Sequence, residues 1–385
     1  MSLLIPLSAP DITQAEIDAV TAVLRTNQLS LGPELTAFER TMAAYHGVGD
    51  AVAVSSGTAG LHLALLALGV GPGAEVLVPS FAFIAVANAV AQVGAIPIFA
   101  DIDPITLNLD PELIEAAITP QTRAILVVHT FGVPAAMDRI LEIAGSHQIK
   151  VIEDACEAIG AEYGGLKAGS FGDLAVFGFY PNKQITTGEG GCILARNPDL
   201  AVRLRSLRNQ GRSAVQLSSD AAPDVNWFDH VEIGYNYRLS EIACTLGRIQ
   251  LDRIEEILAL RRAAAERYQV FLGGIAGLEL PALSLPGRTI SWFVYVVRLP
   301  EGGAGYRSRV QAALTSRGIA TGRYFAPIHR QPAWNDSSSA RAARVPWTDS
   351  IAPRTLALPF FNRITGEQQQ KVAQCLKSAI EGCKR

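Results

Sequence analysis

The segment VLVPSFAFIAVANAVAQVGAIPIFA, residues 76–100, contains no charged residue. Its length alone would let it cross a bilayer core, which takes about 20 apolar residues in a helix. Two prolines, an asparagine, a glutamine and a glycine interrupt it, however, and β-branched runs lie at both ends. This pattern favours a buried strand, a helix and a second strand over a membrane span. Such units build parallel α/β sheets.

Strands of the same kind recur along the first half of the chain. Seven short apolar runs occupy residues 51–54, 75–78, 96–100, 124–129, 150–153, 174–180 and 192–195. The runs are apolar on both faces, and segments with helical periodicity separate most of them. The sequence therefore predicts an α/β fold in which a mostly parallel seven-stranded sheet lies between helices.

The pattern changes near residue 240. Residues 240–272 predict one continuous amphipathic helix of about nine turns. Beyond it, the sequence predicts strands at residues 291–299 and 355–361 and helices at residues 305–317 and 365–380. We therefore expect a large domain over residues 1–250, including the N-terminal segment, and a smaller C-terminal α+β domain over residues 251–385.

Composition excludes some classes of partner. The net charge is −3 and no basic cluster stands out, so neither nucleic acid nor a membrane surface is expected as a partner. The opening MSLLIPLSAP has no basic region and no cleavage pattern, so it does not indicate an export signal. The five cysteines form no CxxC pair, which indicates reduced thiols and a cytoplasmic location. No metal site is expected.

The residues that follow the strands are the first place to look for function, because ligands of open α/β sheets bind at the carboxyl ends of strands. After the first strand comes SSGTAG, residues 55–60, and then a helix. Small residues at such a turn expose backbone N–H groups at a helix N-terminus, which suits a phosphate. An ordinary helix cap by Ser55 or Ser56 is the alternative.

Two other strand ends carry notable side chains. Asp154 directly follows an apolar strand in VIEDACEA, where a buried carboxylate needs a cationic or hydrogen-bonding partner. A cap for the next segment is the alternative interpretation. Phe81 and Phe83 are expected to start the helix after the second strand. One of them is placed to stack on a planar ligand, although both can equally belong to the core.

The segment GFYPNKQITTGEGG, residues 178–191, places a single lysine, Lys183, after a buried strand. Partial desolvation there favours a neutral amine, which can form a Schiff base with an aldehyde. Three glycines that follow let the backbone pass close to a ligand. An aldehyde, a phosphate and a ring nitrogen paired with Asp154 are together the attributes of pyridoxal phosphate.

In these motifs the chain resembles the DegT/DnrJ/EryC1/StrS family of fold-type I, pyridoxal-phosphate-dependent sugar aminotransferases. The resemblance extends over nearly the whole sequence. It is carried, in the family's order, by LGPELTAFE (31–39), SSGTAGLHLAL (55–65), VPSFAFIAVANAV (78–90), HTFGVPAAM (129–137), VIEDACEAIGA (151–161), GFYPNKQITTGEGG (178–191), GYNYRLSEI (234–242) and YFAPIHRQP (324–332).

The resemblance implies roles for particular residues. Lys183 would bond covalently to the cofactor, Asp154 would pair with its ring nitrogen, and Phe83 would stack on its ring. Asn236 would reach the phosphate of the other subunit, which implies a homodimer with composite active sites. The implied cofactor contacts are Gly57, Thr58, Ala59, Phe83, Asp154, Glu157, Gly178, Lys183 and Asn236.

The sequence departs from the family pattern at three positions. Gly178 stands where many members have a serine that binds phosphate, and a serine restored there is expected to be tolerated. Glu157 stands where Gln or His is frequent, in reach of the cofactor's phenolic oxygen or of the substrate. Ala82 replaces a common threonine. The retained Lys183 excludes the family's dehydratase branch, which has a histidine instead.

The resemblance implies transamination of a nucleotide-activated keto-sugar, with a 4-keto-6-deoxy sugar favoured and glutamate as donor, in aminosugar or surface-polysaccharide synthesis. A cyclitol ketone, an aminobenzoate-type precursor and a non-catalytic, cofactor-binding regulator are the alternatives. Expected substrate contacts are His329, Tyr324 and Arg238. Arginines that could meet a diphosphate or the donor's carboxylate, or lie at a surface or interface, are Arg208, Arg212, Arg238 and Arg323.

Overall fold

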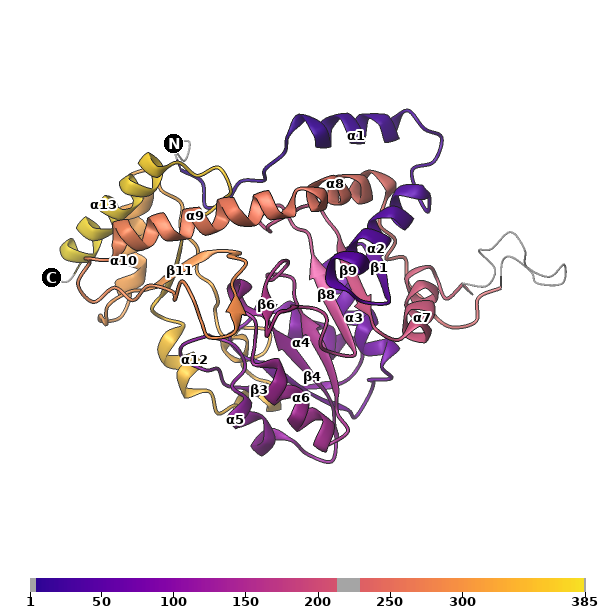
Figure 1. Ribbon diagram of the computed structural model, residues 1–385. Helices are drawn as coiled ribbons and strands as arrows, with labels where there is room; N and C mark the ends of the chain where they lie inside the picture. The colour runs from indigo at the N-terminus through magenta and orange to yellow at the C-terminus, as the bar shows by residue number, and fades with distance from the viewer. Residues whose placement is uncertain (1–4, 213–228, 384–385) are drawn as a thin grey trace.

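A seven-stranded sheet forms the centre of the computed structural model, which describes residues 5–212 and 229–383 (Figure 1). Its strand order is β1-β9-β8-β5-β4-β2-β3, and β9 alone runs antiparallel to its neighbours. Every predicted run forms one of these strands, so the predicted α/β fold is confirmed. The strands are β1 (Asp50–Val54), β2 (Glu75–Pro79), β3 (Ile96–Ala100), β4 (Thr122–Val128), β5 (Lys150–Asp154), β8 (Leu174–Gly178) and β9 (Gly191–Ala195).

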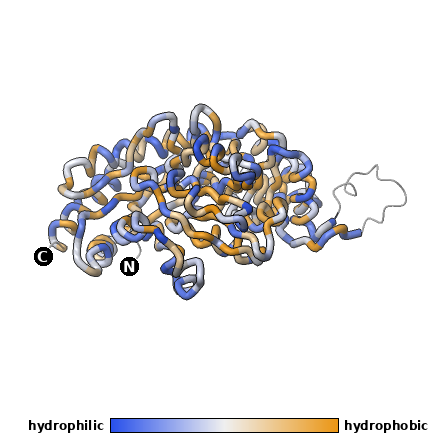
Figure 2. The backbone as a smooth tube through the Cα atoms, turned by 90° about the horizontal axis from the view of Figure 1, so that it is seen from below, coloured by the Kyte–Doolittle hydropathy of each residue, from blue (hydrophilic) through white to orange (hydrophobic). Residues whose placement is uncertain are grey.

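Helices cover both faces of the sheet, which explains why its strands are apolar on both sides. One face packs against α3 (Gly57–Ala67), α4 (Ala85–Gln92) and α7 (Pro198–Arg208). The other packs against α2 (Pro33–His46), α6 (Met137–Ser146) and α8 (Glu241–Asp252). In Figure 2 the hydrophobic stretches concentrate toward the interior. Further helices of this half are α1 (Gln14–Leu24) and α5 (Pro111–Ile114).

The uncharged segment 76–100 forms β2, α4 and β3, as predicted. Its helix has only eight residues and begins at Ala85, so Phe81 and Phe83 precede it rather than start it. The turn through residues 80–84 is longer than the apolar pattern indicated, because an apolar run does not mark where a helix begins. No helix within the described ranges is both long and apolar enough to cross a membrane.

The predicted continuous helix is wrong in one respect, because it breaks at Arg253 into α8 and α9 (Ile254–Leu272). The Arg253 backbone leaves helical geometry, with φ −112° and ψ 21°. Its guanidinium donates to the carboxylates of Asp11, at 2.8 Å, and Glu16, at 3.0 Å. The N-terminal segment thus binds the arginine at the break. This long-range contact could not be predicted from the sequence, because no proline or glycine marks the end of the helix there.

The C-terminal unit, residues 254–383, has a core of its own around β11 (Tyr295–Arg298) and β12 (Thr355–Leu358). The N-terminal segment joins this unit, since the Ile5 N–H donates to the Gly318 carbonyl at 3.1 Å. The division at residues 250 and 251 stays a prediction. Remaining elements are α10 (Tyr306–Thr315), α11 (Ser338–Ala342), α12 (Pro346–Ile351), α13 (Gly366–Gly382), and a small sheet of β6 (Glu162–Tyr163), β7 (Leu166–Lys167) and β10 (Arg288–Thr289).

Candidate active site

A cavity of about 460 Å³ lies at the carboxyl ends of β1, β5 and β8. Residues that follow these strands line it, as expected for an open α/β sheet. Phe293, Tyr324 and Phe325 of the C-terminal unit complete its wall. Of the residues selected from the sequence, the lining contains Gly57, Thr58, Phe83, Asp154, Glu157, Gly178, Lys183 and Tyr324.

Lys183 lies in the connection between β8 and β9, with its backbone N–H bonded to the Tyr180 carbonyl at 2.9 Å. Its side chain is 15% exposed, and its Nζ lies 3.6 Å from Glu157 Oε1. On the other side, Nζ lies 3.9 Å from the centre of the Phe293 ring. The amine is therefore held between a carboxylate and an aromatic face, at the edge of the cavity.

Glu157 is buried beside this amine, and its Oε2 accepts the Phe131 N–H at 2.8 Å. Burial raises the pKa of Glu157, while the neighbouring Lys183 charge opposes that rise. A carboxyl in this position can serve either as a hydrogen-bond donor or as an acceptor. Its role toward a cofactor or substrate stays a prediction.

Asp154 ends β5 with its carboxylate in the cavity, although the residue is only 8% exposed. One oxygen, Oδ1, accepts the Cys156 N–H at 3.1 Å, which is the capping contact of the alternative interpretation. No lysine, arginine or histidine of the described ranges forms an ion pair with it, since Lys183 pairs with Glu157. A protonated ring nitrogen would supply the missing positive partner.

The turn after β1 leads into α3, as predicted. Ser56 caps this helix, its Oγ accepting the Ala59 N–H at 3.0 Å. The capping alternative is therefore present, and the Ala59 N–H already has a partner. Gly57 and Thr58 line the cavity at the helix N-terminus, whereas Ala59 does not. The helix dipole there favours an anion.

Two glycines make room at this end of the cavity. A Cβ added at Gly57 would lie 2.9 Å from Cys156 Sγ, and one added at Gly178 would lie 3.1 Å from the same sulfur. A side chain at either position would therefore press against the Cys156 thiol and the facing glycine. Burial, followed by the nearby Asp154 charge, raises the pKa of the Cys156 thiol well above its usual value.

The aromatic residues divide between site and core. Phe83 lines the cavity and is 60% exposed, whereas Phe81 is fully buried among core residues. The Tyr324 hydroxyl lies 3.5 Å from the amide nitrogen of Asn182. Phe83 is thus the phenylalanine of the pair that is free to stack on a ligand.

Asn236, Arg238 and His329 also lie outside this cavity. Asn236 is exposed and forms a backbone bridge with Asn209, whose Oδ1 also accepts from Arg238 at 2.8 Å. His329 is buried, with Nδ1 2.7 Å from Ser80 Oγ. Its Nε2 lies 3.2 Å from Asp349 in a separate hollow. Burial lowers the pKa of His329.

The other arginines selected for a diphosphate also lie outside the cavity lining. Arg208 is buried, donating to Glu39 and to the Ala53 carbonyl at 2.7 Å, so it stabilises the fold around β1. Arg323 donates to Gln311 at 2.6 Å on the exposed surface. Arg212 follows α7 in the turn at residues 209–212. None of these positions favours a contact within the chain's own site.

Sequence reasoning missed several residues of the lining, above all Phe293, Asn182 and Cys156. Asn182 and Cys156 adjoin selected residues, so their neighbourhood was a usable signal. Phe293 lies in a run that was interpreted only as a strand, and no neighbouring residue indicates that its ring contacts the Lys183 amine. Such a contact between residues far apart in the chain depends on the packing of the C-terminal unit.

The residues present fit pyridoxal phosphate. Gly57 and Gly178 line the cavity without side chains, next to a helix N-terminus suited to phosphate. Asn182, which lines the cavity, has a buried Oδ1 without a hydrogen-bond partner among the described residues. No group of three or more His, Cys, Asp or Glu residues in the described ranges could hold a metal ion.

Known proteins resemble this chain over most of its length. GDP-perosamine synthase of Caulobacter vibrioides is 43% identical over 330 residues, covering 85% of this chain and 86% of that protein. The spore coat polysaccharide biosynthesis protein SpsC of Bacillus subtilis is 36% identical, covering 98% and 97%. The solved structure of Spr1654 from Streptococcus pneumoniae in its PLP form is 26% identical, covers 98% of this chain and 99% of that chain, and has a TM-score of 0.91.

The sequence pattern of one family matches residues 10–377, which include every strand of the central sheet and Lys183. The resemblance, the fold-type I architecture, the aminotransferase activity and the cofactor expected from the sequence are thereby confirmed. The chain belongs to the DegT/DnrJ/EryC1/StrS family of aminotransferases, and pyridoxal phosphate is its cofactor.

Proposed function

We propose that this enzyme transfers an amino group from glutamate to the ketone of a nucleotide-activated sugar. The observation that carries the proposal is the meeting of Lys183, Asp154 and the N-terminus of α3 in one cavity. The relatives support the substrate class, because one is named for a GDP-linked amino sugar and another for a coat polysaccharide.

Pyridoxal phosphate, when bound, supplies an aldehyde for the donor amine and a conjugated ring that draws electrons from the donor's α-carbon. Asp154 would hold a proton on the ring nitrogen, which strengthens this withdrawal. Gly57 and Thr58 would bind the phosphate with backbone N–H groups, and Phe83 would orient the ring.

Lys183 would move the proton. Its Nζ would take the proton from the donor's α-carbon and deliver it to the carbon that carried the aldehyde, and would reverse the transfer for the keto-sugar. Phe293, buried beside the amine, would help to exclude water from this transfer. Glu157, 3.6 Å away, would hold the amine in line between transfers.

The proposal includes a 4-keto-6-deoxy sugar as acceptor and a homodimer with shared sites. Asn236 is exposed and outside its own chain's cavity, which agrees with a contact to the partner's phosphate. The five cysteines are free thiols, which agrees with a reducing cytoplasm.

A coupled assay tests the function. The holoenzyme is given glutamate and a panel of nucleotide-linked keto-sugars, and the aminated carbon of any product is assigned by NMR. We expect amination of a 4-keto-6-deoxy sugar and none with Lys183→Ala. Bleaching of the bound-cofactor absorbance by glutamate would separate an enzyme from a regulator. Failure of all the sugars, or turnover by Lys183→Ala, would overturn the proposal.

A further inference from the structure

Helix α9 contains a fully buried arginine that no ion pair explains. Arg261 is 2% exposed, and no carboxylate of the described residues lies within ion-pair distance of it. Its Nε donates to the Trp292 carbonyl at 2.7 Å and its Nη2 to the Phe293 carbonyl at 2.7 Å. Its Nη1 donates to Asn362 Oδ1. Two adjacent carbonyls are thus gripped by one planar group.

Burial of this charge is unfavourable unless hydrogen bonds offset it. The burial lowers the pKa of Arg261 to about 9, with the charge of Asp11 opposing the fall. A methionine or leucine would fill the same space without that cost. The arginine is therefore explained by the several N–H donors of its planar guanidinium and not by the volume of its side chain.

The segment that Arg261 grips has an unusual backbone. Trp292 has φ +54°, in the left-handed region that residues with a Cβ rarely occupy. Flanking hydrogen bonds tie the segment to the site, from Ser291 N–H to the Gly132 carbonyl at 3.0 Å and from Gln184 Nε2 to Ser291 Oγ at 3.0 Å. Gln184 directly follows Lys183 in the chain.

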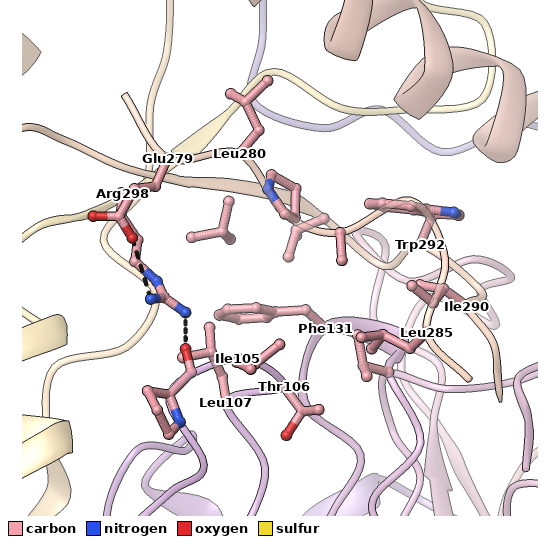
Figure 3. Close-up of a pocket in the computed structure, with 16 residues that line it drawn as sticks. Ile105, Thr106, Leu107, Phe131, Glu279, Leu280, Leu285, Ile290, Trp292 and Arg298 are labelled. Atoms are coloured by element: carbon pink, nitrogen blue, oxygen red, sulfur yellow. Dashed lines mark hydrogen bonds and ion pairs between the residues drawn. The ribbon is translucent and has the colours of Figure 1, made fainter. Parts of the chain in front are cut away.

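This segment also separates two cavities. Ile290, Trp292, Val294 and Val296 line a second cavity of about 270 Å³, and Figure 3 shows Trp292 and Ile290 bordering it across from Phe131. Phe293, between them in sequence, instead lines the active-site cavity. The turned backbone at Trp292 precedes the residue whose ring lies 3.9 Å from Lys183 Nζ.

We propose that Arg261 is a positioning residue, which fixes the Trp292–Phe293 backbone so that the Phe293 ring holds the Lys183 amine in place for bonding to the cofactor. Arg261 touches neither substrate nor cofactor in this arrangement. The proposal rests on the proposed function only in taking Lys183 as the residue that bonds the cofactor.

The test measures bond formation rather than turnover. Apo-protein is mixed with pyridoxal phosphate, samples are fixed with borohydride at timed intervals, and the label on Lys183 is quantified by mass spectrometry. We expect Arg261→Gln to slow labelling at least about tenfold, because small misplacements of a reacting group are costly. Arg261→Lys keeps a positive charge but loses the planar set of donors, so its rate of Lys183 labelling should lie between those of the wild type and Arg261→Gln.

A matched control comes from the same helix. Arg267 also donates to a side-chain amide oxygen and to a backbone carbonyl, those of Gln369 and Ile364, and none of these three residues lines the active-site cavity. Arg267→Gln should label at the wild-type rate even if its melting temperature falls. In steady state, Arg261→Gln should lower kcat while leaving KM for glutamate unchanged, since it binds no substrate.

Phe293→Leu keeps the proposal testable if Arg261→Gln does not fold. It should slow labelling to a similar extent. Wild-type labelling rates in either variant would overturn the inference, and so would equal slowing in Arg267→Gln. No label on Lys183 in the wild type would instead overturn the proposed function.

Discussion

At the scale of single residues, Asp154 combines two contacts that separate its structural and chemical roles. One oxygen caps the turn at Cys156, and the rest of the carboxylate faces the cavity without a positive partner in the described ranges. An asparagine preserves the oxygen that caps the turn but removes the negative charge. The two roles can therefore be measured separately.

We expect Asp154→Asn to lower kcat by about 100-fold or more, since the charge that holds the ring proton is lost. Its free energy of unfolding, from urea titration of the apo-protein, should change by less than about 1 kcal/mol. Asp110→Asn is the control, because Asp110 makes a comparable cap to Glu112 N–H away from the site. Near-native turnover by Asp154→Asn would leave only the capping role.

Gly178 is the residue at which structure and family pattern give opposite expectations. The family's serine predicts tolerance of Gly178→Ser, but a Cβ there would lie 3.1 Å from Cys156 Sγ and 3.5 Å from Gly57 Cα. The Cys156 thiol would therefore have to shift by a few tenths of an ångström to admit the serine.

We therefore expect Gly178→Ser alone to weaken cofactor binding, with an overpacking cost of about 1–3 kcal/mol. Adding Cys156→Ala should restore affinity, because the smaller side chain frees that space. Fluorescence titration of the apo-proteins with pyridoxal phosphate gives the four dissociation constants of the cycle. Independent effects of the two changes would show that sulfur and serine do not compete.

At the scale of secondary-structure elements, the sequence predicted every strand of the sheet, because apolarity on both faces is a local signal. The positions of Asp154, Lys183 and the α3 turn could be predicted for the same reason, since Asp154 ends β5 and the other two lie in the segments after β8 and β1. The break at Arg253 and the approach of Phe293 could not. Both depend on contacts between distant segments, with Asp11 in one case and Arg261 in the other.

Helix α2 contains a titrating group that makes stability depend on pH. His46 is buried, its Nδ1 donating to the Met42 carbonyl at 2.9 Å, and its Nε2 has no partner among the described residues. Burial lowers the pKa of His46 to about 4, from an ordinary value of 6.5. Between these values the unfolded chain binds a proton that the folded protein does not.

The free energy of unfolding should therefore fall as the pH falls from 6.5 to 4, by on the order of 3 kcal/mol from this residue. Urea unfolding across that range should show a shallower dependence in His46→Leu than in the wild type. The comparison uses the slope of unfolding free energy against pH, because repacking around residue 46 changes that free energy equally at every pH. His147→Gln, an exposed histidine, is the control and should keep the wild-type slope. An unchanged slope in His46→Leu would contradict the assignment.

At the scale of the whole molecule, the position of Asn236 bears on how many chains make one site. It is exposed and lies outside the cavity of its own chain. If it completes the partner's site, two inactive chains can complement each other in a dimer.

We expect mixtures of Lys183→Ala and Asn236→Ala chains to recover about a quarter of wild-type activity after subunit exchange, since half of the dimers are mixed and each has one intact site. Lys183→Ala mixed with the Lys183→Ala, Asn236→Ala double variant is the control, because no intact pairing can form. Exchange is verified by native mass spectrometry. Exchange without recovery would show that each chain supplies its own site.

The reversed strand β9 has a consequence for the order in which the chain can fold during synthesis. Of the described strands, β9 alone pairs with β1, so β1 leaves the ribosome complete at Val54 but finds its place only after Gly191 has emerged. Lys183 lies on the stretch that connects β8 to this last strand. The turn after β1 therefore meets Lys183 in one cavity only once β9 has paired with β1. A truncated product that stops before β9 would carry the lysine without a site to hold it.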